Sequence, residues 1–335
     1  MLTYVLKRLT WMVPTLFGIS LVCFVVINLA PGSPVEQALS KVRFATGAGN
    51  SGAGVSDEVV EAIKVQYGFD KPLHIRYLIW LKNIVTLDFG ESFSYQRPVI
   101  DVILDKLPIS LQFGIVSLLL IYMISIPLGI AKAVRDGGQF DLWTSVALMV
   151  ASSIPPLILG ILMRVYLAGG QFLDIFPLGE LYSDNYYDLS MWGKFLDRAH
   201  HFVLPLVCYV VNGFTVLVFL MKNSLLEEIR LDYVRTARAK GVAERQVVYK
   251  HALRNALIPI LTGLGSFLTV FFAGSIIIEQ VYNIDGMGLL SYKSILSRDY
   301  NVIMALIFIQ SVLAMAGRLI SDITYVLVDP RIDFQ

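Results

Sequence analysis

Long uncharged stretches alternate with short charged ones along most of the chain. Six stretches hold no Asp, Glu, Lys or Arg: Leu9–Val35, Leu107–Ala131, Leu142–Met163, Phe202–Met221, Asn255–Ile278 and Asn301–Gly317. A helix needs about 20 apolar residues to cross the hydrocarbon core of a bilayer. Five stretches reach this length, and the sixth reaches it when it continues past Arg318 to Val328. The pattern predicts an all-α membrane protein with six transmembrane helices.

Composition supports a membrane protein. Hydrophobic residues make up 56% of the chain and charged residues only 16%, whereas soluble domains carry about 25% charged residues. The net charge of +1 gives no indication of a nucleic-acid partner. Cys23 and Cys208 lie inside apolar stretches, where a thiol behaves as a small apolar group. We expect neither a disulfide nor a metal site from them.

The first apolar stretch could be a retained helix or a cleaved signal peptide. It is longer than the roughly 7–15 apolar residues of a signal core, and no small-x-small cleavage site follows it. A retained transmembrane helix is therefore the favoured interpretation.

Basic residues indicate which loops face the cytoplasm, because short cytoplasmic loops are enriched in Lys and Arg. Lys7 and Arg8 precede the first stretch, Lys132 and Arg135 follow the second, and Arg331 follows the sixth. The segment from Lys222 to Arg254 holds eight basic residues, whereas the opposite short loops hold two each: Lys194, Arg198, Lys293 and Arg298. We expect both termini and the Lys222–Arg254 loop to be cytoplasmic, which agrees with six crossings.

This topology divides the chain into four parts. Residues 1–30 form the cytoplasmic N-terminus and first helix, 31–108 an extracytoplasmic insertion, 109–328 the remaining five helices, and 329–335 a cytoplasmic tail. The alternative for the insertion is a mostly disordered loop.

Sequence signals inside the insertion favour a small helical cap. A Gly-rich stretch at residues 45–54 precedes Ser56, which can cap a helix that Gly68 would end. Pro72 can start a second helix, because its fixed φ suits a first helical turn. Apolar side chains recur along that second helix at spacings of three and four: Tyr77, Leu78, Trp80, Leu81 and Ile84.

The Lys222–Arg254 loop is the least membrane-like part of the C-terminal half. Its eight basic and four acidic residues give a net charge of +4. Helical spacing places one set of residues on a common face: Leu225, Leu226, Ile229, Tyr233, Thr236, Ala237 and Lys240. Gly241 then interrupts the pattern, and a new helix begins near Arg245. Two short helices should therefore meet at a glycine with positive φ.

The small residues at this turn would let the backbone of another protein approach closely. Tyr233, Ala237 and Gly241 are each four residues apart and should lie on one side. The alternative is a basic amphipathic helix resting on anionic lipid. Glu227, Glu228 and Asp232 weaken that alternative.

Few residues of the membrane stretches carry chemistry. Arg164 lies near the outer end of the third helix, where it is expected to snorkel, and Arg318 and Asp322 are spaced to pair on the sixth. Candidate polar residues for a substrate pathway are Asn212, Thr215, Ser266, Thr269 and Ser275.

The sequence lacks the motifs of an enzyme. It holds no G-x-x-x-x-G-K-[ST] phosphate loop, and none of its four histidines lies in an H-E-x-x-H pattern. A secondary transporter or channel is an alternative function, but it would need ion-binding residues at mid-membrane. A membrane enzyme, the other alternative, would need catalytic groups there.

Several motifs resemble one transport family. Asp232–Gly241 and His251–Pro259 resemble the EAA loop of binding-protein-dependent ABC importers, in the version of dipeptide and oligopeptide permeases. Further stretches are similar to the first permease subunit of those systems: Tyr4–Leu9, Ala30–Pro34, Asp88–Ser92, Leu107–Leu111, Arg298–Tyr300 and Asp329–Arg331. Met221–Ser224 and Asn283–Gly288 are most similar to the Yej-type branch, which is linked to peptide and microcin C uptake.

The resemblance implies a fold and a role. The fold would be a type I ABC importer permease core, with the insertion following its first helix, in a bacterial inner membrane. The EAA-like loop would dock in a groove of a cytoplasmic ATPase through Asp232, Tyr233, Arg235, Thr236, Ala237, Arg238 and Gly241. The chain departs from Glu-Ala-Ala by reading Thr236-Ala237-Arg238, which leaves the role of Arg238 open.

The resemblance also implies partner chains. These are a second homologous permease, two ATP-binding subunits or one fused ATPase, and an extracytoplasmic peptide-binding protein. This chain would bind no cofactor itself, because ATP and magnesium belong to the ATPase.

Cysteine labelling tests the predicted topology. A single cysteine at Asn50 should react with a membrane-impermeant maleimide in intact spheroplasts, because residues 31–108 are expected outside. A single cysteine at Lys240 should react only after the membrane is broken. Labelling of Asn50 only in broken membranes would contradict the topology.

Overall fold

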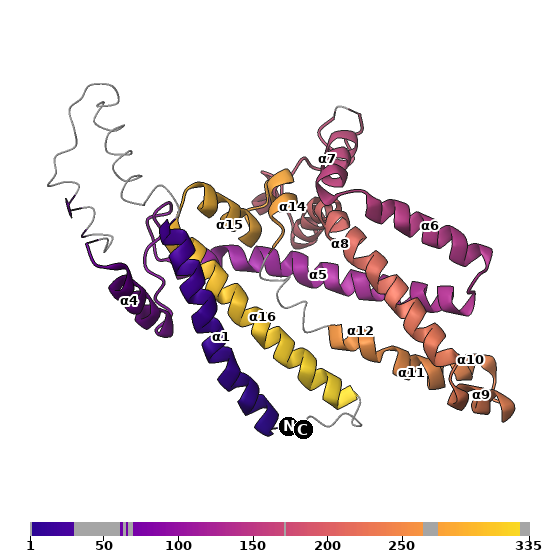
Figure 1. Cartoon of the computed structure of the whole chain (residues 1–335). Helices are drawn as coiled ribbons and strands as arrows, with labels where there is room; N and C mark the ends of the chain where they lie inside the picture. Colours follow the sequence, from indigo (N-terminus) through magenta and orange to yellow (C-terminus); the bar gives the residue numbers. More distant parts are fainter. Residues whose placement is uncertain are drawn as a thin grey trace. The chain divides into compact units, whose positions relative to one another are not determined.

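The computed structural model describes residues 2–29, 61–62, 65, 70–170, 172–263 and 274–328. These residues form helices and connecting turns, and their few β contacts are the isolated bridges Glu91–Pro98 and Ala168–Phe176. The all-α prediction is confirmed. The elements, labelled in Figure 1 where space allows, are α1 (Leu2–Leu29), α4 (Leu73–Val85), α5 (Val99–Val134), α6 (Gln139–Ser153), α7 (Pro156–Leu167), the 3₁₀-helix η1 (Tyr186–Asp188), α8 (Met191–Ile229), α9 (Asp232–Ala239), α10 (Glu244–Gln246), the π-helix η2 (Val247–Ala252), α11 (Leu253–Ala256), α12 (Ile258–Thr262), α14 (Ile276–Val281), α15 (Met287–Leu296) and α16 (Tyr300–Val328).

Three helices are each long and apolar enough to cross a membrane: α1, α5 and α16. Two bent pairs meet the same criterion, namely α6 with α7 and the two parts of α8, so the described residues offer up to five spans. The expected span Asn255–Ile278 includes residues 264–273, which lie outside the described part. The predicted count of six therefore stays a prediction.

The third apolar stretch forms two helices rather than the one transmembrane helix that we expected. Helices α6 and α7 meet at an angle of 91°. Ile154 and Pro155 have extended backbone, with ψ of 117° and 141°. Pro155 and Pro156 explain the break, because a proline excludes the α conformation from the residue before it and cannot donate a helical hydrogen bond.

Contacts divide the chain into two compact units: Leu2–Leu107 with Leu290–Val312 form the N-terminal unit, and Pro108–Leu289 with Leu313–Gln335 form the central unit. In the N-terminal unit, α4 packs through Tyr77 against α1. The Tyr77 hydroxyl lies 2.8 Å from that of Ser20, and its ring contacts Phe24 at a centroid distance of 5.2 Å. The predicted helix is present, and it begins at Leu73 with Pro72 at the N-cap position rather than in the first turn.

The predicted apolar stripe of α4 is only partly buried. Tyr77 and Ile84 are buried, whereas the Leu78 side chain is 60% exposed. The earlier signals of the insertion, the Gly-rich stretch and the helix from Ser56 to Gly68, lie outside the described residues.

Motifs far apart in the sequence meet in this unit. Asp299, fully buried, accepts hydrogen bonds from the Ser92 hydroxyl at 2.6 Å and the Ser94 N–H at 2.9 Å. The Asn301 amide donates to the Glu91 carbonyl at 2.8 Å. The Asp88–Ser92 motif is thereby fixed beside the start of α16.

Two apolar clusters lie in the described part of the central unit. One surrounds the stacked rings of Phe113 and Phe202, whose centroids are 4.1 Å apart, and includes Cys208 and Tyr282. The other joins α5 and α8 to the segment that follows α8. Its buried members are Ile121, Ile130, Ala133, Leu217, Met221, Leu225, Val234, Val247, Val248, Ala252, Ala256 and Ile260.

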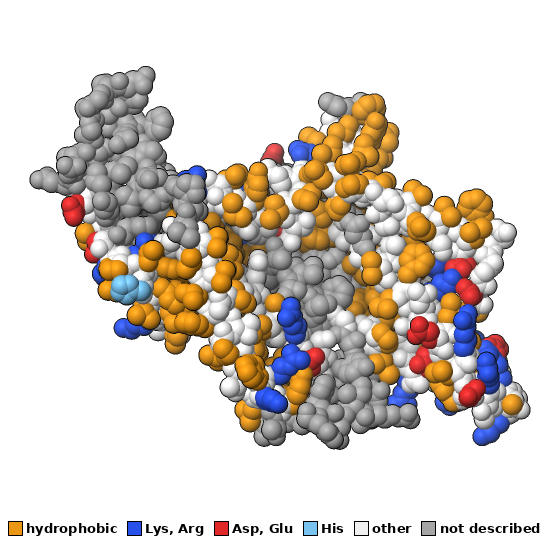
Figure 2. Space-filling view, viewed as in Figure 1, with side chains coloured by type: hydrophobic (Ala, Val, Ile, Leu, Met, Phe, Trp, Pro, Cys, Tyr) orange, Lys and Arg blue, Asp and Glu red, His pale blue; other side chains and the backbone are white. Residues whose placement is uncertain are grey.

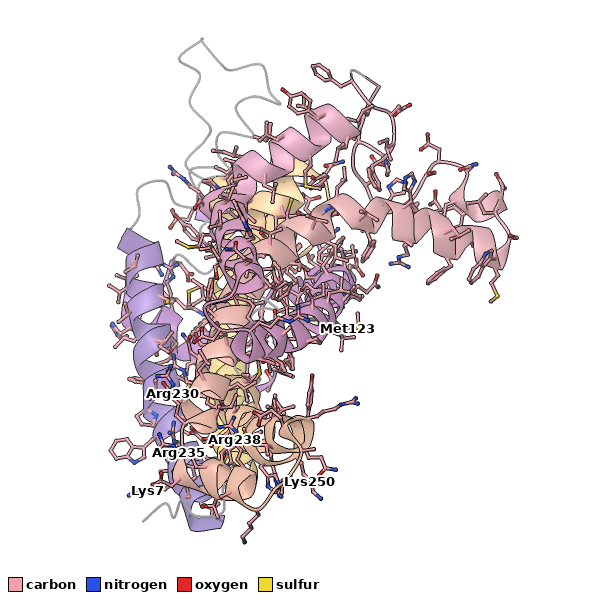
Figure 3. The ribbon with its side chains drawn as sticks, turned by 90° about the vertical axis from the view of Figure 1, so that its right-hand side faces the viewer. Lys7, Met123, Arg230, Arg235, Arg238 and Lys250 are labelled. Carbon is pink, nitrogen blue, oxygen red and sulfur yellow. The ribbon has the colours of Figure 1, made fainter. Side chains whose placement is uncertain are left out.

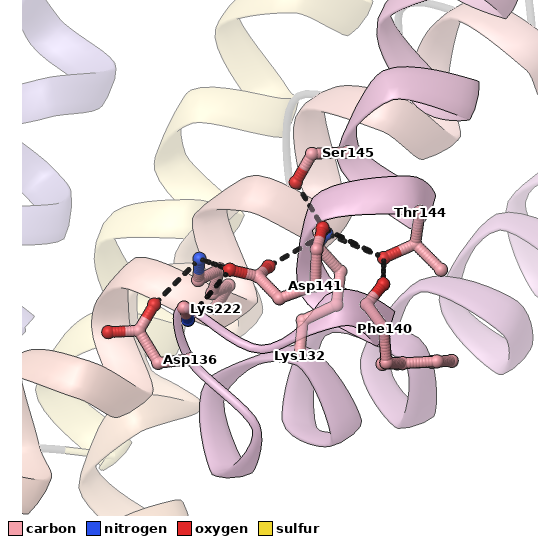
Figure 4. A network of polar contacts seen from close by, with 8 residues as sticks. Lys132, Asp136, Phe140, Asp141, Thr144, Ser145 and Lys222 are labelled. Atoms are coloured by element: carbon pink, nitrogen blue, oxygen red, sulfur yellow. Dashed lines mark hydrogen bonds and ion pairs between the residues drawn. The ribbon is translucent and has the colours of Figure 1, made fainter.

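A buried polar network links three helices of this unit (Figure 4). Lys132 on α5 is fully buried, and its Nζ donates to the Asp141 carbonyl, Thr144 Oγ1 and Ser145 Oγ at 2.7–2.9 Å. The Asp141 carboxylate at the start of α6 pairs with Lys132 at 3.0 Å and with Lys222 of α8 at 2.7 Å. Lys222 also pairs with Asp136 at 2.9 Å. The network therefore fixes the α5–α6 turn to α8.

Removing Lys132 should destabilise the protein. Lys132→Met should cost about 1–3 kcal/mol of unfolding free energy, because the buried Asp141 carbonyl and one Asp141 carboxylate oxygen lose their donor while Lys222 still pairs with the other oxygen. Arg235→Met is the matched control, since the Arg235 and Asp232 side chains are 69% and 96% exposed and such pairs contribute about 0–1 kcal/mol. Thermal unfolding in detergent would measure both, and equal small shifts would contradict the prediction.

Candidate functional site

The segment from Arg230 to Ala256 packs against the helix bundle through an apolar underside. Val234 of α9 and Val247 of η2 are fully buried, as is Leu225 of α8. They belong to the cluster that includes Ile130 and Ala133 of α5. We call this segment the loop core. Its helices are thus held by both α5 and α8.

Gly241 forms the turn between the two helical parts, as the sequence predicts. Its φ is +76°, its N–H donates to the Arg238 carbonyl at 2.9 Å, and the Val242 N–H donates to the Ala237 carbonyl at 3.3 Å. A Cβ atom built on Gly241 would meet no atom within 4 Å among the described residues beyond its two chain neighbours. The space beside the turn is therefore open.

Arg238 and Glu244 form a bidentate ion pair across this turn. Arg238 Nε donates to Glu244 Oε2 at 3.0 Å, and Nη2 donates to Oε1 at 2.7 Å. The hydrogen bond from Arg238 lowers the pKa of the Glu244 carboxyl. Arg238, whose role the sequence leaves open, thus ties α9 to α10.

Tyr233 joins three elements through its hydroxyl. It donates to the Glu228 carboxylate of α8 and accepts from Asn255 Nδ2 of α11 at 3.1 Å. Burial, followed by the hydrogen bond to Glu228, raises the pKa of Tyr233 to about 12. Tyr233 therefore stays a neutral donor, fixing α9 between α8 and α11.

Ala237 lies differently from the expected arrangement with Tyr233 and Gly241. Its side chain is half-buried and packs against the apolar cluster. Thr236 is exposed, and its hydroxyl donates to the Asp232 carbonyl at 2.9 Å within α9. The open edge of the turn is therefore formed by Gly241 and its polar neighbours.

Charged side chains cover the outer face of the loop core. Asp232, Arg235, Arg238, Lys240 and Glu244 are all exposed. Acidic and basic atoms gather over α9 and α10 in Figure 2. Figure 3 shows Arg230, Arg235, Arg238 and Lys250 in this same part of the central unit. This segment therefore has an apolar inner face and a charged outer face.

The helix after Gly241 is irregular. Residues Val247–Ala252 form a π-helix between α10 and α11. Such single-turn π segments are rare and occur frequently at functional sites. The sequence predicts a helix here but not its wider turn.

The structure describes only some of the candidate pathway residues. Thr215 is buried beside α6, with its hydroxyl 3.5 Å from the Leu148 carbonyl. Ser275 caps α14 by accepting from the Ile278 N–H at 3.4 Å. Ser266 and Thr269, together with the Asn212 side chain, lie outside the described part.

The charges expected in the membrane helices have distinct surroundings. On α16, Arg318 is exposed and Asp322 is half-buried, and their pairing stays a prediction. Arg164 Nη1 donates to the Val281 carbonyl at 2.5 Å, so this side chain binds the end of α14.

Sequence reasoning missed two buried charges. From the sequence, Lys132 was used only to orient the chain in the membrane, although this lysine directly follows the apolar stretch Leu107–Ala131. Glu279 directly follows another stretch, is fully buried, and accepts hydrogen bonds from the Leu289 N–H at 2.8 Å and from Ser110 Oγ at 3.2 Å. The signal available for both was a lone charge at the end of an apolar run.

Comparison with known proteins defines the class of the chain. Residues 125–334 match the family described as binding-protein-dependent transport system inner membrane component, and residues 1–114 match its N-terminal counterpart. The chain belongs to this family. It is therefore the permease subunit of a binding-protein-dependent transporter and a multi-pass inner-membrane protein.

Three relatives are similar over nearly their whole length. The peptidoglycan transport system permease protein YejB of Agrobacterium fabrum is 42% identical over 99% of this chain and 98% of the relative. The inner membrane ABC transporter permease protein YejB of Escherichia coli is 40% identical over 99% of both chains. The oligopeptide transport system permease protein AppB of Bacillus subtilis is 34% identical over 100% of both. The predicted family and its Yej-type branch are confirmed.

The Tyr233 hydroxyl should stabilise the loop core. Tyr233→Phe removes its hydrogen bonds to Glu228 and Asn255, and should cost about 0.5–1.5 kcal/mol. Tyr249→Phe is the control, because Tyr249 is 54% exposed and no described residue hydrogen-bonds to its hydroxyl. Hydrogen exchange of residues 232–256 should accelerate only in Tyr233→Phe. Equal exchange in the two variants would contradict the role of Tyr233.

Proposed function

We propose that this chain is the permease subunit of an ATP-driven importer of peptides and forms half of its translocation pathway. The family supports the permease role. The names of the relatives support the substrate class, since one is a peptidoglycan and another an oligopeptide transport protein. Peptidoglycan carries short peptides whose amide-linked backbone is that of an oligopeptide, so the proposed substrate is a short peptide or peptide-bearing fragment.

The loop core is the proposed coupling surface for the ATPase. The observation that carries this proposal is the open space beside Gly241, at the edge of a helix pair whose underside is fixed to α5 and α8. A partner backbone can approach the turn closely. A force applied there would reach the membrane helices directly through the buried cluster.

The proposed assembly contains a second homologous permease, two ATP-binding subunits or one fused ATPase, and an extracytoplasmic peptide-binding protein. ATP and magnesium are bound by the ATPase, and this chain hydrolyses nothing itself. Both termini and the loop core face the cytoplasm. A pathway with polar residues such as Asn212 but no strong fixed charge would suit peptides of varied sequence.

Gly241→Val should abolish coupled uptake while leaving the subunit in the membrane. A β-branched residue at φ +76° is strained, and its bulk would fill the space that the ATPase needs. Gly241→Ala should be milder. Peptide uptake, membrane level of the subunit and co-purification of the ATPase would be measured for both variants.

Gly170→Val is the matched control. Gly170 has φ +72° in the α7–α8 connection, and among the described residues beyond its chain neighbours a Cβ there would contact Asp174 alone, at 4.0 Å. Gly170→Val introduces similar backbone strain, but at a site distant in sequence from the loop core. It should therefore retain ATPase binding. Wild-type uptake by Gly241→Val would refute the coupling role, whereas its loss from the membrane would show that Gly241 serves folding.

A further inference from the structure

The first turns of α8 expose an apolar stripe. Met191, Trp192, Phe195 and Leu196 are 92%, 68%, 61% and 52% exposed. Ala199 and Val203 continue the stripe at helical spacing and are also exposed. Trp192 and Phe195 stack on each other at a centroid distance of 5.4 Å. This segment precedes the stretch Phe202–Met221, so the sequence places it in a polar loop.

The polar side of the same turns faces the protein. Asp197 accepts from the Ser183 hydroxyl at 2.6 Å and from the Ser183 N–H at 3.0 Å. Arg198 Nη2 donates to Gln112 Oε1 of α5 at 2.7 Å, and the His201 ring lies 3.0 Å from the Gly179 carbonyl. The usual polarity of a surface helix in water is thereby reversed.

Tyrosines lie directly before this stripe. The ring of Tyr186 on η1 contacts those of Tyr182 and Tyr187 at 4.9 and 5.5 Å. Lys194 Nζ lies 5.8 Å from the centre of the Tyr186 ring, so this cation turns back toward η1. Asp184 lies between Tyr182 and Tyr186 in the sequence, and Asp188 follows Tyr187. Both carboxylates are exposed and favour hydration. The region thus combines an apolar helical face with amphipathic rings and hydrated charges.

We propose that the start of α8, from Met191 to Ala199, is an interfacial helix that buries its apolar stripe at the boundary between lipid headgroups and acyl chains. Tyr and Trp are enriched at this depth, and amphipathic helices there bury their apolar face about 5–10 Å deep. The exposed charges of η1 keep the segment at the surface, since they would be costly in the hydrocarbon core.

Lipid fits the stripe better than a soluble partner does. The stripe contains no charged residue, and its neighbouring cations turn inward to Tyr186 and Gln112. It also continues through Val203 into the apolar stretch of α8 that is expected to cross the bilayer. Figure 3 shows these first turns extending outward from the central unit. A binding-protein surface would instead mix polar groups into the exposed face.

Depth-dependent fluorescence quenching tests this proposal. The full chain would carry Trp11→Phe, Trp80→Phe and Trp143→Phe, leaving Trp192 as its only tryptophan, in phosphatidylcholine nanodiscs. Lipid brominated near the headgroup end of its acyl chains should remove most of the Trp192 emission. Lipid brominated near the chain ends should remove less, and aqueous iodide should remove little. The control carries Trp192→Phe and Lys240→Trp, and iodide should quench it strongly.

A spin label provides a second measurement that leaves the tryptophans unchanged. Attached at Leu196→Cys in a chain with Cys23→Ser and Cys208→Ala, it should collide more with dissolved oxygen than with a water-soluble nickel chelate. Strong quenching of Trp192 by iodide, with none by brominated lipid, would overturn the proposal. If neither iodide nor brominated lipid quenched Trp192, protein rather than lipid would cover the stripe. That result would also overturn the proposal.

Discussion

The central unit depends on one buried cation. The Lys132 side chain is fully buried, and a lone ion in such surroundings would cost several kcal/mol. The start of α6 offsets the cost of burying this charge. One carbonyl, two hydroxyls and the Asp141 carboxylate of α6 surround Lys132 Nζ. This requirement determines where the α5–α6 turn can lie. Through Asp141 and Lys222 it determines the position of α8 as well.

The same turn of α5 supports the loop core. Ile130 and Ala133 flank Lys132 and belong to the apolar cluster that buries Val234 and Val247. On α8, Met221 belongs to this cluster, and the next residue, Lys222, belongs to the polar network. Apolar and ionic contacts are therefore adjacent along both helices. A displacement of α9 would be opposed by both kinds of contact, which makes the loop core and the start of α6 one mechanical element.

The sequence predicted features that depend on local properties. Uninterrupted apolar runs predicted α1, α5 and α16, and Gly241 predicted a turn with positive φ. One local signal was missed: the adjacent Pro155 and Pro156 break the third apolar stretch with a bend of 91°, although single prolines are tolerated in membrane helices. The same reasoning failed where distant residues decide the structure. The roles of Lys132 and Glu279 depend on partners brought close by folding. Arg238 was found as a motif position, but its bond to Glu244 crosses a turn whose geometry no spacing rule gives.

The π-helix Val247–Ala252 gives the loop core one place where the chain length can change at little cost. An α-helix advances about 100° per residue, and a π turn accommodates one residue more within a single turn. Removing one residue from this turn would let it close to an α-turn while α11 and α12 keep their facing, so Ala256 and Ile260 would stay in the apolar cluster. Removing one residue from a regular turn of α8 would instead rotate the loop core by about 100° relative to the helix before it. The wide turn is therefore the part of this segment that tolerates the loss of a residue.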